Sequence, residues 1–213
     1  YMKKGDLINI LKTRGGEKYK DDDEYNFQPL SDLELWNIFR QVAAGIRYLH
    51  FQNVVHGDIK PQNLLIGDDG VVKIADFGIS KMLHASGQKL ADASGTPAFM
   101  SPELFDTGQT FSGQLADIWA LGATMWMLKF GNPPFIAKNI VALSNKIQND
   151  KLVFPAPCDE KLQDLLENML QKNPDRRFSL QQVIMHPWMR TQPPPSAKAP
   201  AAASGSGSGS GGE

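Results

Sequence analysis

The 213-residue sequence has one cysteine, almost no net charge and no long hydrophobic run. Because Cys158 is the lone cysteine, no disulfide can form within the chain, and a reducing, cytoplasmic location is expected. A formal net charge of −1 provides no global field for nucleic acid or a membrane surface, so neither is expected as a partner. No apolar run approaches the roughly 20 residues of a membrane span. Cys158 itself follows two prolines, and we interpret it as a structural or exposed thiol rather than a nucleophile.

The sequence divides into a body, residues 1–190, and a tail, residues 191–213. The tail consists mainly of Pro, Ala, Ser and Gly, which cannot bury enough surface to offset chain entropy, so it is predicted to be disordered. The chain as a whole is 41% hydrophobic, which is ordinary for a globular domain and sufficient for a sizeable core. Residues 12–29 are polar and contain the acidic run Asp21–Glu24. We interpret them as a solvated loop, with the gripping of basic substrates as the alternative.

Helical patterns dominate the body. Ser31 and Glu34 have capping-box spacing at the start of a helical hydrophobic pattern, and Asp6 can cap a short helix of its own. Two β-type runs flank the turn sequence Gly-Asp-Asp-Gly at residues 67–70, which predicts a hairpin. Further helices are expected near residues 115–129, 138–149, 160–171 and 179–185. The predicted fold class is therefore mainly α, with a small β patch.

Three segments carry the chemistry: HGDIKPQN at residues 56–63, ADFG at 75–78 and GTPAFMSPE at 95–103. Each is weak evidence alone, but the three in this order and spacing are specific. On these segments the chain resembles the large, C-terminal lobe of eukaryotic protein kinases over residues 1–190. The resemblance implies ATP-dependent phosphoryl transfer to a protein substrate, with ATP and Mg²⁺ as cofactors.

Phosphoryl transfer depends on positioning and on neutralising phosphate charge, which requires hard oxygen ligands for Mg²⁺. Asp76 and Asn63 are the predicted metal ligands, although each alone would be interpreted as a turn residue. Asp58 is the expected base that orients the substrate hydroxyl and accepts its proton. Lys60 lies two residues further on and would neutralise the transferred phosphate, in a pattern that fits Ser/Thr specificity. Thr96 is predicted to hydrogen-bond both Asp58 and Lys60.

The resemblance also implies how ATP would bind. Backbone near Met2 would bond adenine, Asp6 would reach the ribose, and Leu65 would form the apolar floor beneath the base. A glycine-rich strand–turn, a strand lysine and a helix glutamate are not found; the glycine repeat of the tail has no strand before it and no helix after it. We therefore expect that the N-terminal lobe is absent, that the chain begins at the hinge, and that it is truncated and poorly active alone.

Further residues match the structural supports of such a lobe. Glu103 is expected to pair with Arg177, and Asp117 to hydrogen-bond the backbone of the catalytic loop. His56 is interpreted as a structural histidine, and no catalytic role is expected for His50 or His84.

One departure from the family pattern is Gly57, which stands where most kinases have an arginine that meets an activation-segment phosphate. Control by phosphorylation of that segment should therefore be weaker. Ser86, Ser94 and Thr96 are nevertheless candidate phosphorylation sites.

Within the superfamily, the chain resembles calmodulin-dependent protein kinase kinases and the plant kinases that activate kinases of the sucrose-nonfermenting-related and AMP-activated type. The likeness rests on residues 54–61, 95–103, 111–113 and 186–188. It makes another kinase's activation loop a candidate substrate. Two alternatives remain: a non-catalytic, kinase-derived scaffold, and a helical interaction domain whose motifs are accidental.

Overall fold

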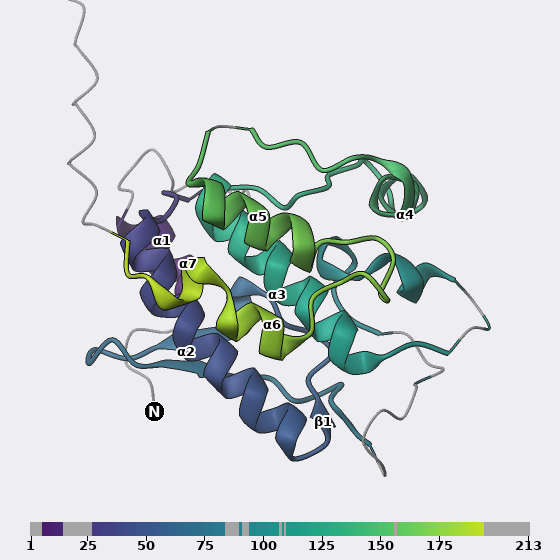
Figure 1. The fold of residues 1–213 in the computed structure, drawn as a ribbon, viewed down its shortest axis with the longest axis horizontal. Helices are drawn as coiled ribbons and strands as arrows, with labels where there is room; N and C mark the ends of the chain where they lie inside the picture. The colour runs from purple at the N-terminus through teal and green to yellow at the C-terminus, as the bar shows by residue number, and fades with distance from the viewer. Residues whose placement is uncertain are drawn as a thin grey trace, which may run out of the picture.

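Two long helices, α2 (Asp32–Phe51) and α3 (Gly113–Phe130), pack against each other at the centre of the fold (Figure 1). The computed structural model describes residues 6–14, 27–83, 90, 94–106, 108, 110–155 and 157–193. Shorter helices surround the central pair: α1 (Leu7–Arg14), α4 (Ile140–Asn149), α5 (Glu160–Met169), α6 (Leu180–Met185) and α7 (Pro187–Arg190). The expectation of a mainly helical, kinase-like domain with a small β patch is confirmed for these residues.

Several predictions fall outside the described residues: those for Met2, the acidic run, His84, Ser86 and residues 194–213 of the tail. Helix α7 ends at Arg190, where the tail was expected to begin, but the order of the tail itself stays a prediction. In the part of the chain that the structure describes, no helix has the length and hydropathy needed to cross a membrane.

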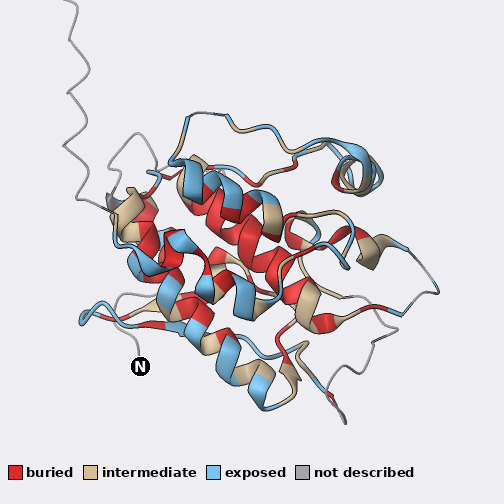
Figure 2. Ribbon diagram, viewed as in Figure 1, coloured by how far each residue is buried: buried red, intermediate tan, exposed pale blue. Residues whose placement is uncertain are grey.

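Helix α2 begins where the sequence predicts. The Ser31 backbone N–H donates to Glu34 Oε2 at 3.0 Å, and Ser31 Oγ accepts from the Glu34 N–H at 3.4 Å, which completes the capping box. The apolar side of the helix enters the core, while its other side faces solvent (Figure 2). The buried residues of α2 follow the predicted helical interval: Leu35, Trp36, Ile38, Phe39, Val42, Ala43 and Ile46. This helix therefore combines a local start signal with a core-facing stripe.

Helix α3 is buried on nearly all sides, in agreement with its hydrophobic sequence. It begins two residues earlier than predicted because Ser112 caps it, accepting from the Leu115 N–H at 3.3 Å. Its last residue is Phe130, and the residue that caps its C-terminal end, Gly131, has a φ of 87°, which suits a glycine. Trp119 is fully buried and stacks at 6.3 Å on Phe135, so α3 forms the centre of the core.

The β patch consists of two short antiparallel pairs. Strand β2 (Leu64–Ile66) pairs with β3 (Val72–Ile74), which confirms the predicted hairpin, although Val71 lies outside the strand. Strand β1 (Val54–Val55) pairs with β4 (Lys81–Met82), a partner that the sequence did not indicate. The described residues also form three short 3₁₀ helices: η2 (Pro61–Asn63), η3 (Pro97–Phe99) and η4 (Pro102–Phe105). Segments 56–63 and 95–103 thereby come to lie beside the β patch.

Lys172 is a half-buried cation packed on the core, with its Nζ 3.8 Å from the ring centroid of Phe135 and 5.3 Å from that of Trp119. It also donates to the Ile147 carbonyl. Burial lowers the pKa of Lys172 from 10.5 to about 8, although the charge of Asp150 acts in the opposite direction. Between these pH values the unfolded chain binds more protons than the folded chain.

The free energy of unfolding should therefore gain a contribution from Lys172 that rises as the pH increases from about 8 towards 10.5. Urea unfolding at several pH values in this range measures it. The variant Lys172→Met should lose this rise, whereas Lys161→Met, at an exposed lysine, should keep it. An equal rise in both variants would show that Lys172 is not its source.

Candidate active site

The loop of residues 56–63 is anchored by one buried carboxylate from α3. Asp117 accepts from the backbone N–H groups of His56 (Oδ2, 3.0 Å) and Gly57 (Oδ1, 2.9 Å), as predicted. Asp117 is 1% exposed, and its Oδ2 also lies 2.8 Å from His50 Nε2. This role of His50 as a support of the anchor was not predicted from the sequence. The side chain of Asp117 on the central helix α3 therefore fixes the conformation of this loop.

His56 connects this loop to the segment that contains Asp76. Its ring is fully buried, with Nε2 3.0 Å from the Ala75 carbonyl and Nδ1 3.2 Å from the backbone nitrogen of Asp58. With the proton on Nε2, both ring nitrogens bond to the backbone. The ring also contacts Phe77 edge-on, with the centroids 5.1 Å apart. This arrangement agrees with the prediction of a structural histidine, since neither nitrogen is directed at a substrate.

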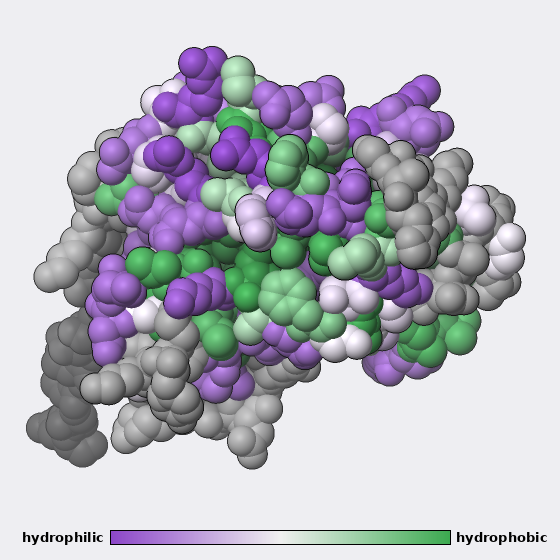
Figure 3. Space-filling view, turned by 90° about the horizontal axis from the view of Figure 1, so that it is seen from below, coloured by the Kyte–Doolittle hydropathy of each residue, from purple (hydrophilic) through white to green (hydrophobic). Residues whose placement is uncertain are grey.

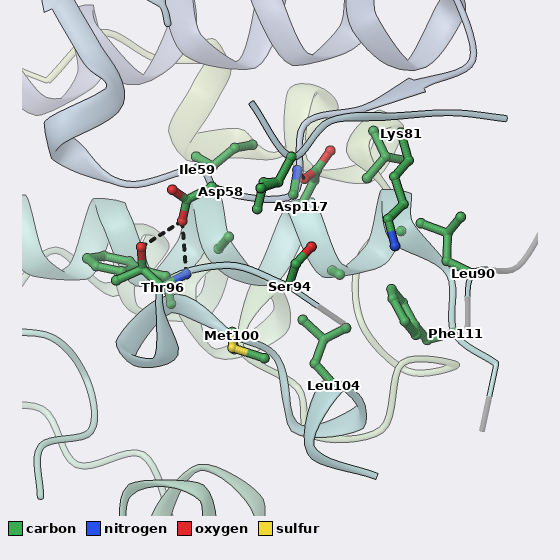
Figure 4. Close-up of a pocket in the computed structure, with 17 residues that line it drawn as sticks. Asp58, Ile59, Lys81, Leu90, Ser94, Thr96, Met100, Leu104, Phe111 and Asp117 are labelled. Atoms are coloured by element: carbon green, nitrogen blue, oxygen red, sulfur yellow. Dashed lines mark hydrogen bonds between the residues drawn. The ribbon is translucent and has the colours of Figure 1, made fainter. Parts of the chain in front are cut away.

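Asp58, Lys60 and Thr96 form a closed hydrogen-bond network, of which Figure 4 shows the bonds between Asp58 and Thr96. Asp58 Oδ1 accepts from the Thr96 hydroxyl at 2.7 Å and from the Thr96 N–H at 2.9 Å. Lys60 Nζ donates to Thr96 Oγ1 at 2.6 Å and lies 2.7 Å from Asp58 Oδ2. The predicted contacts of Thr96 with both residues are therefore confirmed.

The network determines the charge of Asp58. Burial alone would raise the pKa of this carboxyl, but hydrogen bonds from Lys60 and Thr96, together with the Lys60 charge, outweigh burial and hold the pKa below its ordinary value. Asp58 is therefore ionised at neutral pH. A carboxylate with a lowered pKa is a weak base, so its first contribution would be to orient a hydroxyl group.

Asn63 directly precedes β2 and Asp76 lies two residues after β3, so the two residues flank the same end of the hairpin. The Asn63 amide nitrogen donates to Asp58 O at 2.8 Å and to Asp58 Oδ2 at 3.2 Å, which leaves Oδ1 as its acceptor atom. The Asn63 carbonyl accepts from the Ala75 N–H at 2.8 Å, which places Asp76 one residue further along. Asp76 has φ of 62°, is exposed, and accepts from the Gly78 N–H at 3.1 Å.

This donor set fits Mg²⁺, because a carboxylate and an amide oxygen are hard ligands and Mg²⁺ is commonly held by few protein groups. Among the described residues, no three His, Cys, Asp or Glu side chains gather into a metal-binding cluster. An Asp–Asn pair would leave the remaining positions for water and phosphate oxygens.

The predicted nucleotide-binding residues lie at the edge of the hairpin. Asp6 forms an antiparallel β-bridge with Leu65, so the chain entering α1 passes beside the predicted floor of the base site. The Asp6 carboxylate accepts from the Asn9 N–H at 2.9 Å and from the Asn9 side chain at 2.5 Å, which confirms its capping role. A ribose would share this carboxylate with Asn9. The prediction for Met2 cannot be placed, because that residue lies outside the described part.

A small cavity of about 30 Å³ lies between the catalytic loop, α3 and residues 94–104 (Figure 4). Its lining is largely apolar and includes Ile79, Leu90 and Phe111. Gly57 borders it with φ of 83°, and a side chain there would meet Ile79 at 3.6 Å. This cavity was not predicted from the sequence, and it lies where the arginine of the usual family pattern is replaced by glycine.

The predicted pair of Glu103 and Arg177 is confirmed and is bidentate. Arg177 Nη1 lies 2.6 Å from Glu103 Oε1, and Nη2 lies 2.8 Å from Oε2. The guanidinium also donates to the carbonyls of Leu115 at 2.9 Å and Gln171 at 3.1 Å. The Arg177 side chain is fully buried, so this pair ties η4, which includes the end of segment 95–103, to the start of α3 and the region after α5.

The protein kinase domain family matches residues 1–189, and the chain belongs to that family. The match covers nearly the whole described chain. It does not confirm the expectation that an N-terminal lobe is missing, which stays a prediction.

The curated relatives are serine/threonine protein kinases. The chain is 45% identical to a calcium/calmodulin-dependent protein kinase kinase of Caenorhabditis elegans over 166 residues, 76% of this chain and 31% of the relative. It is 38% identical to the serine/threonine-protein kinase GRIK1 of Arabidopsis thaliana over 184 residues, 86% of this chain and 46% of the relative. It is 41% identical to human serine/threonine-protein kinase STK11 over 160 residues, 74% of this chain and 37% of the relative. The matched part of the chain thus spans less than half the length of these relatives.

Proposed function

We propose that this chain supplies the phosphoacceptor and metal side of a Ser/Thr protein kinase active site. The observation that carries the proposal is the network in which Asp58 bonds Thr96, Lys60 and Asn63 at once. Such a network places an ionised carboxylate, a cation and an amide oxygen within one small volume. These are the groups that phosphoryl transfer to a hydroxyl requires.

In the proposed mechanism, Asp58 Oδ2 accepts a hydrogen bond from the substrate hydroxyl and takes its proton as the hydroxyl oxygen bonds to the γ-phosphorus of ATP. The bond from that phosphorus to the bridging oxygen breaks in the same step, and ADP leaves. Oδ1 is held by two hydrogen bonds from Thr96, so the carboxylate cannot rotate away. Lys60 lies against Oδ2 and can shift its donors to the transferred phosphate. When bound, Mg²⁺ supplies charge neutralisation for the phosphate oxygens, and Asn63 Oδ1 with the Asp76 carboxylate would hold it.

The proposed ATP site extends from Asp76 to the edge of the hairpin. Leu65 is half-buried and would support the base, the Asp6 carboxylate would bond the ribose, and backbone near Met2 would bond adenine. The bridge between Asp6 and Leu65 supports this proposal, because it brings two of these three positions together.

The proposed substrate class is another protein kinase, modified on its activation loop. The name of the C. elegans relative describes a kinase that acts on a kinase, and 45% identity supports the same role here. A cytoplasmic location fits such a substrate and is part of the proposal.

We further propose that these residues do not supply the glycine-rich turn, the strand lysine and the helix glutamate that would complete the ATP site. Figure 3 shows hydrophobic side chains gathered in a band across the face on which hairpin β2–β3 lies. Two large hydrophobic side chains near this hairpin are exposed: Phe77 is 47% exposed and Val71 is 42% exposed. A second lobe would cover such a face and contribute the glycine-rich turn that encloses phosphates.

Nucleotide binding tests this proposal. The 213-residue chain should show little or no increase in melting temperature with excess ATP and Mg²⁺, because a ligand stabilises a fold only as far as it binds to it, and the glycine-rich turn and strand lysine that would contact phosphate are not found in these residues. A complete kinase domain carrying this sequence should show a clear shift and transfer phosphate to serine or threonine. A large shift in the chain alone would show that these residues hold ATP without a second lobe. Absence of transfer by the complete domain would instead favour the scaffold alternative.

A further inference from the structure

Three arginines line a hollow on the flank of α2 away from the hairpin. Arg40 and Arg47 come from α2, and Arg190 comes from α7. The hollow has a volume of about 380 Å³. On the other flank of α2, Gln41 Nε2 donates to Gly70 O at 3.2 Å, so the hairpin and the catalytic loop lie elsewhere. We call this hollow the arginine groove.

Each arginine of the groove is exposed, and none forms an ion pair with a carboxylate of the described residues. Lys60 and Arg177 near the catalytic loop, by contrast, are each paired with a carboxylate. Neighbouring cations repel one another, and an anion bound among these three arginines would relieve this repulsion. The protein as a whole has a net charge of −1, so the groove is a local positive site.

The groove is also partly preorganised. The guanidinium of Arg40 lies 4.5 Å from the centroid of the Trp36 ring, which limits the orientations of its planar donors. Trp36 Nε1 in turn donates to the Trp188 carbonyl at 3.1 Å, two residues before Arg190. The two walls of the groove are therefore tied together beside the arginines.

The floor of the groove is apolar and recessed. Ala43 is 1% exposed and Met189 is 5% exposed, with the half-buried Ile184 beside them. A recessed apolar floor can receive a side chain, whereas the flat surface of a lipid bilayer would contact only the arginine tips. This shape favours a peptide over a membrane.

We propose that the arginine groove is a docking site for an extended acidic segment of a protein partner. Arg40 and Arg47 are seven residues apart on α2, which places them roughly 10.5 Å apart along the helix axis. Residues three positions apart in a polyproline II segment lie on one face, about 9.3 Å apart. Two glutamates at this spacing can meet both arginines, while an apolar residue between them rests on the floor and Arg190 closes the opposite wall. The guanidinium fork favours carboxylate in a bidentate geometry.

Fluorescence polarisation with the 213-residue chain tests the proposal. The probe is a labelled peptide with the sequence Glu-Pro-Leu-Glu between Gly-Ser flanks, and its control has glutamine in place of both glutamates. The glutamate peptide should bind saturably and more weakly as salt increases, and the glutamine peptide should bind at least roughly tenfold more weakly. The triple variant Arg40→Gln/Arg47→Gln/Arg190→Gln should lose roughly tenfold or more in affinity.

The matched control is Arg176→Gln, which removes an exposed arginine outside the groove and should leave affinity unchanged. Circular dichroism melting establishes whether the triple variant remains folded. The comparison of the glutamate and glutamine peptides uses the unmodified protein, so it tests the proposal even if the triple variant does not fold. The proposal is overturned if the glutamate peptide does not bind saturably, or if the triple variant binds it as well as the unmodified chain does. It is also overturned if vesicles of phosphatidylserine or single-stranded RNA bind through these arginines while the glutamate peptide does not. Phosphoryl transfer is not part of the readout, so the outcome is independent of the proposed kinase activity.

Discussion

The variant Asp58→Asn should lose phosphoryl transfer by roughly 10²–10⁴-fold, because proton transfer by a positioned base contributes about this factor. Asparagine keeps the shape of aspartate and can still accept from Thr96, but it cannot take the proton of the substrate hydroxyl. It also leaves Lys60, which lies 2.7 Å from Asp58 Oδ2, without its anionic partner. The loss should therefore appear in kcat, with little change in the KM for ATP. Transfer of labelled phosphate by a complete kinase domain that contains this sequence measures both constants.

The matched control for this experiment is Asp175→Asn, which neutralises an exposed aspartate away from the loop and should leave kcat unchanged. Circular dichroism should show the same fold for both variants, because the anchor of the loop is Asp117 and not Asp58. Full activity in folded Asp58→Asn would refute the role assigned to this residue.

The second large effect is expected on stability, at the buried pair of Glu103 and Arg177. Replacing Glu103 with alanine leaves a guanidinium with a fully buried side chain and no counter-charge. Breaking a buried pair from one side typically costs about 3–5 kcal/mol, so the free energy of unfolding should fall by that amount. Equilibrium unfolding in urea measures the change, as a shift of the midpoint at constant slope.

A double-mutant cycle separates the pair from its surroundings. Arg177→Met alone should also destabilise the fold, because the carbonyls of Leu115 and Gln171 lose their donors. The double variant Glu103→Ala/Arg177→Met should be less destabilised than the sum of the two single changes, since neither charge is then left unpaired. Additive changes would indicate that the two side chains are not coupled in the folded protein.

Features with local causes were predictable from the sequence. The capping box at Ser31 and Glu34 marks the start of α2 because both residues act on backbone within one turn. The hairpin around residues 67–70 follows from its turn residues in the same way. The network of Asp58, Lys60 and Thr96 was also predicted, but from the resemblance to a family and not from local physics, since Thr96 lies 38 residues from Asp58.

Features that depend on tertiary packing were not predictable. His50 lies on the last turn of α2, and nothing in its neighbourhood indicates the contact with Asp117, which is 67 residues away. Strand β4 has a weak sequence pattern and exists because β1 lies beside it. The arginine groove forms because α2 and α7 pack side by side, and the pattern of hydrophobic residues along each helix does not predict which other helix it will contact.

The position of Asp117 has a consequence for biosynthesis. The loop at residues 56–58 leaves the ribosome well before its anchor, because Gly57 and Asp117 are 60 residues apart. At translation rates of 5–20 residues per second, this separation corresponds to a delay of roughly 3–12 s. During that interval the nascent chain has the loop sequence without the hydrogen bonds that shape it. Synonymous codons that slow elongation between the two positions would lengthen this interval and extend the exposure of the unfolded loop to chaperones.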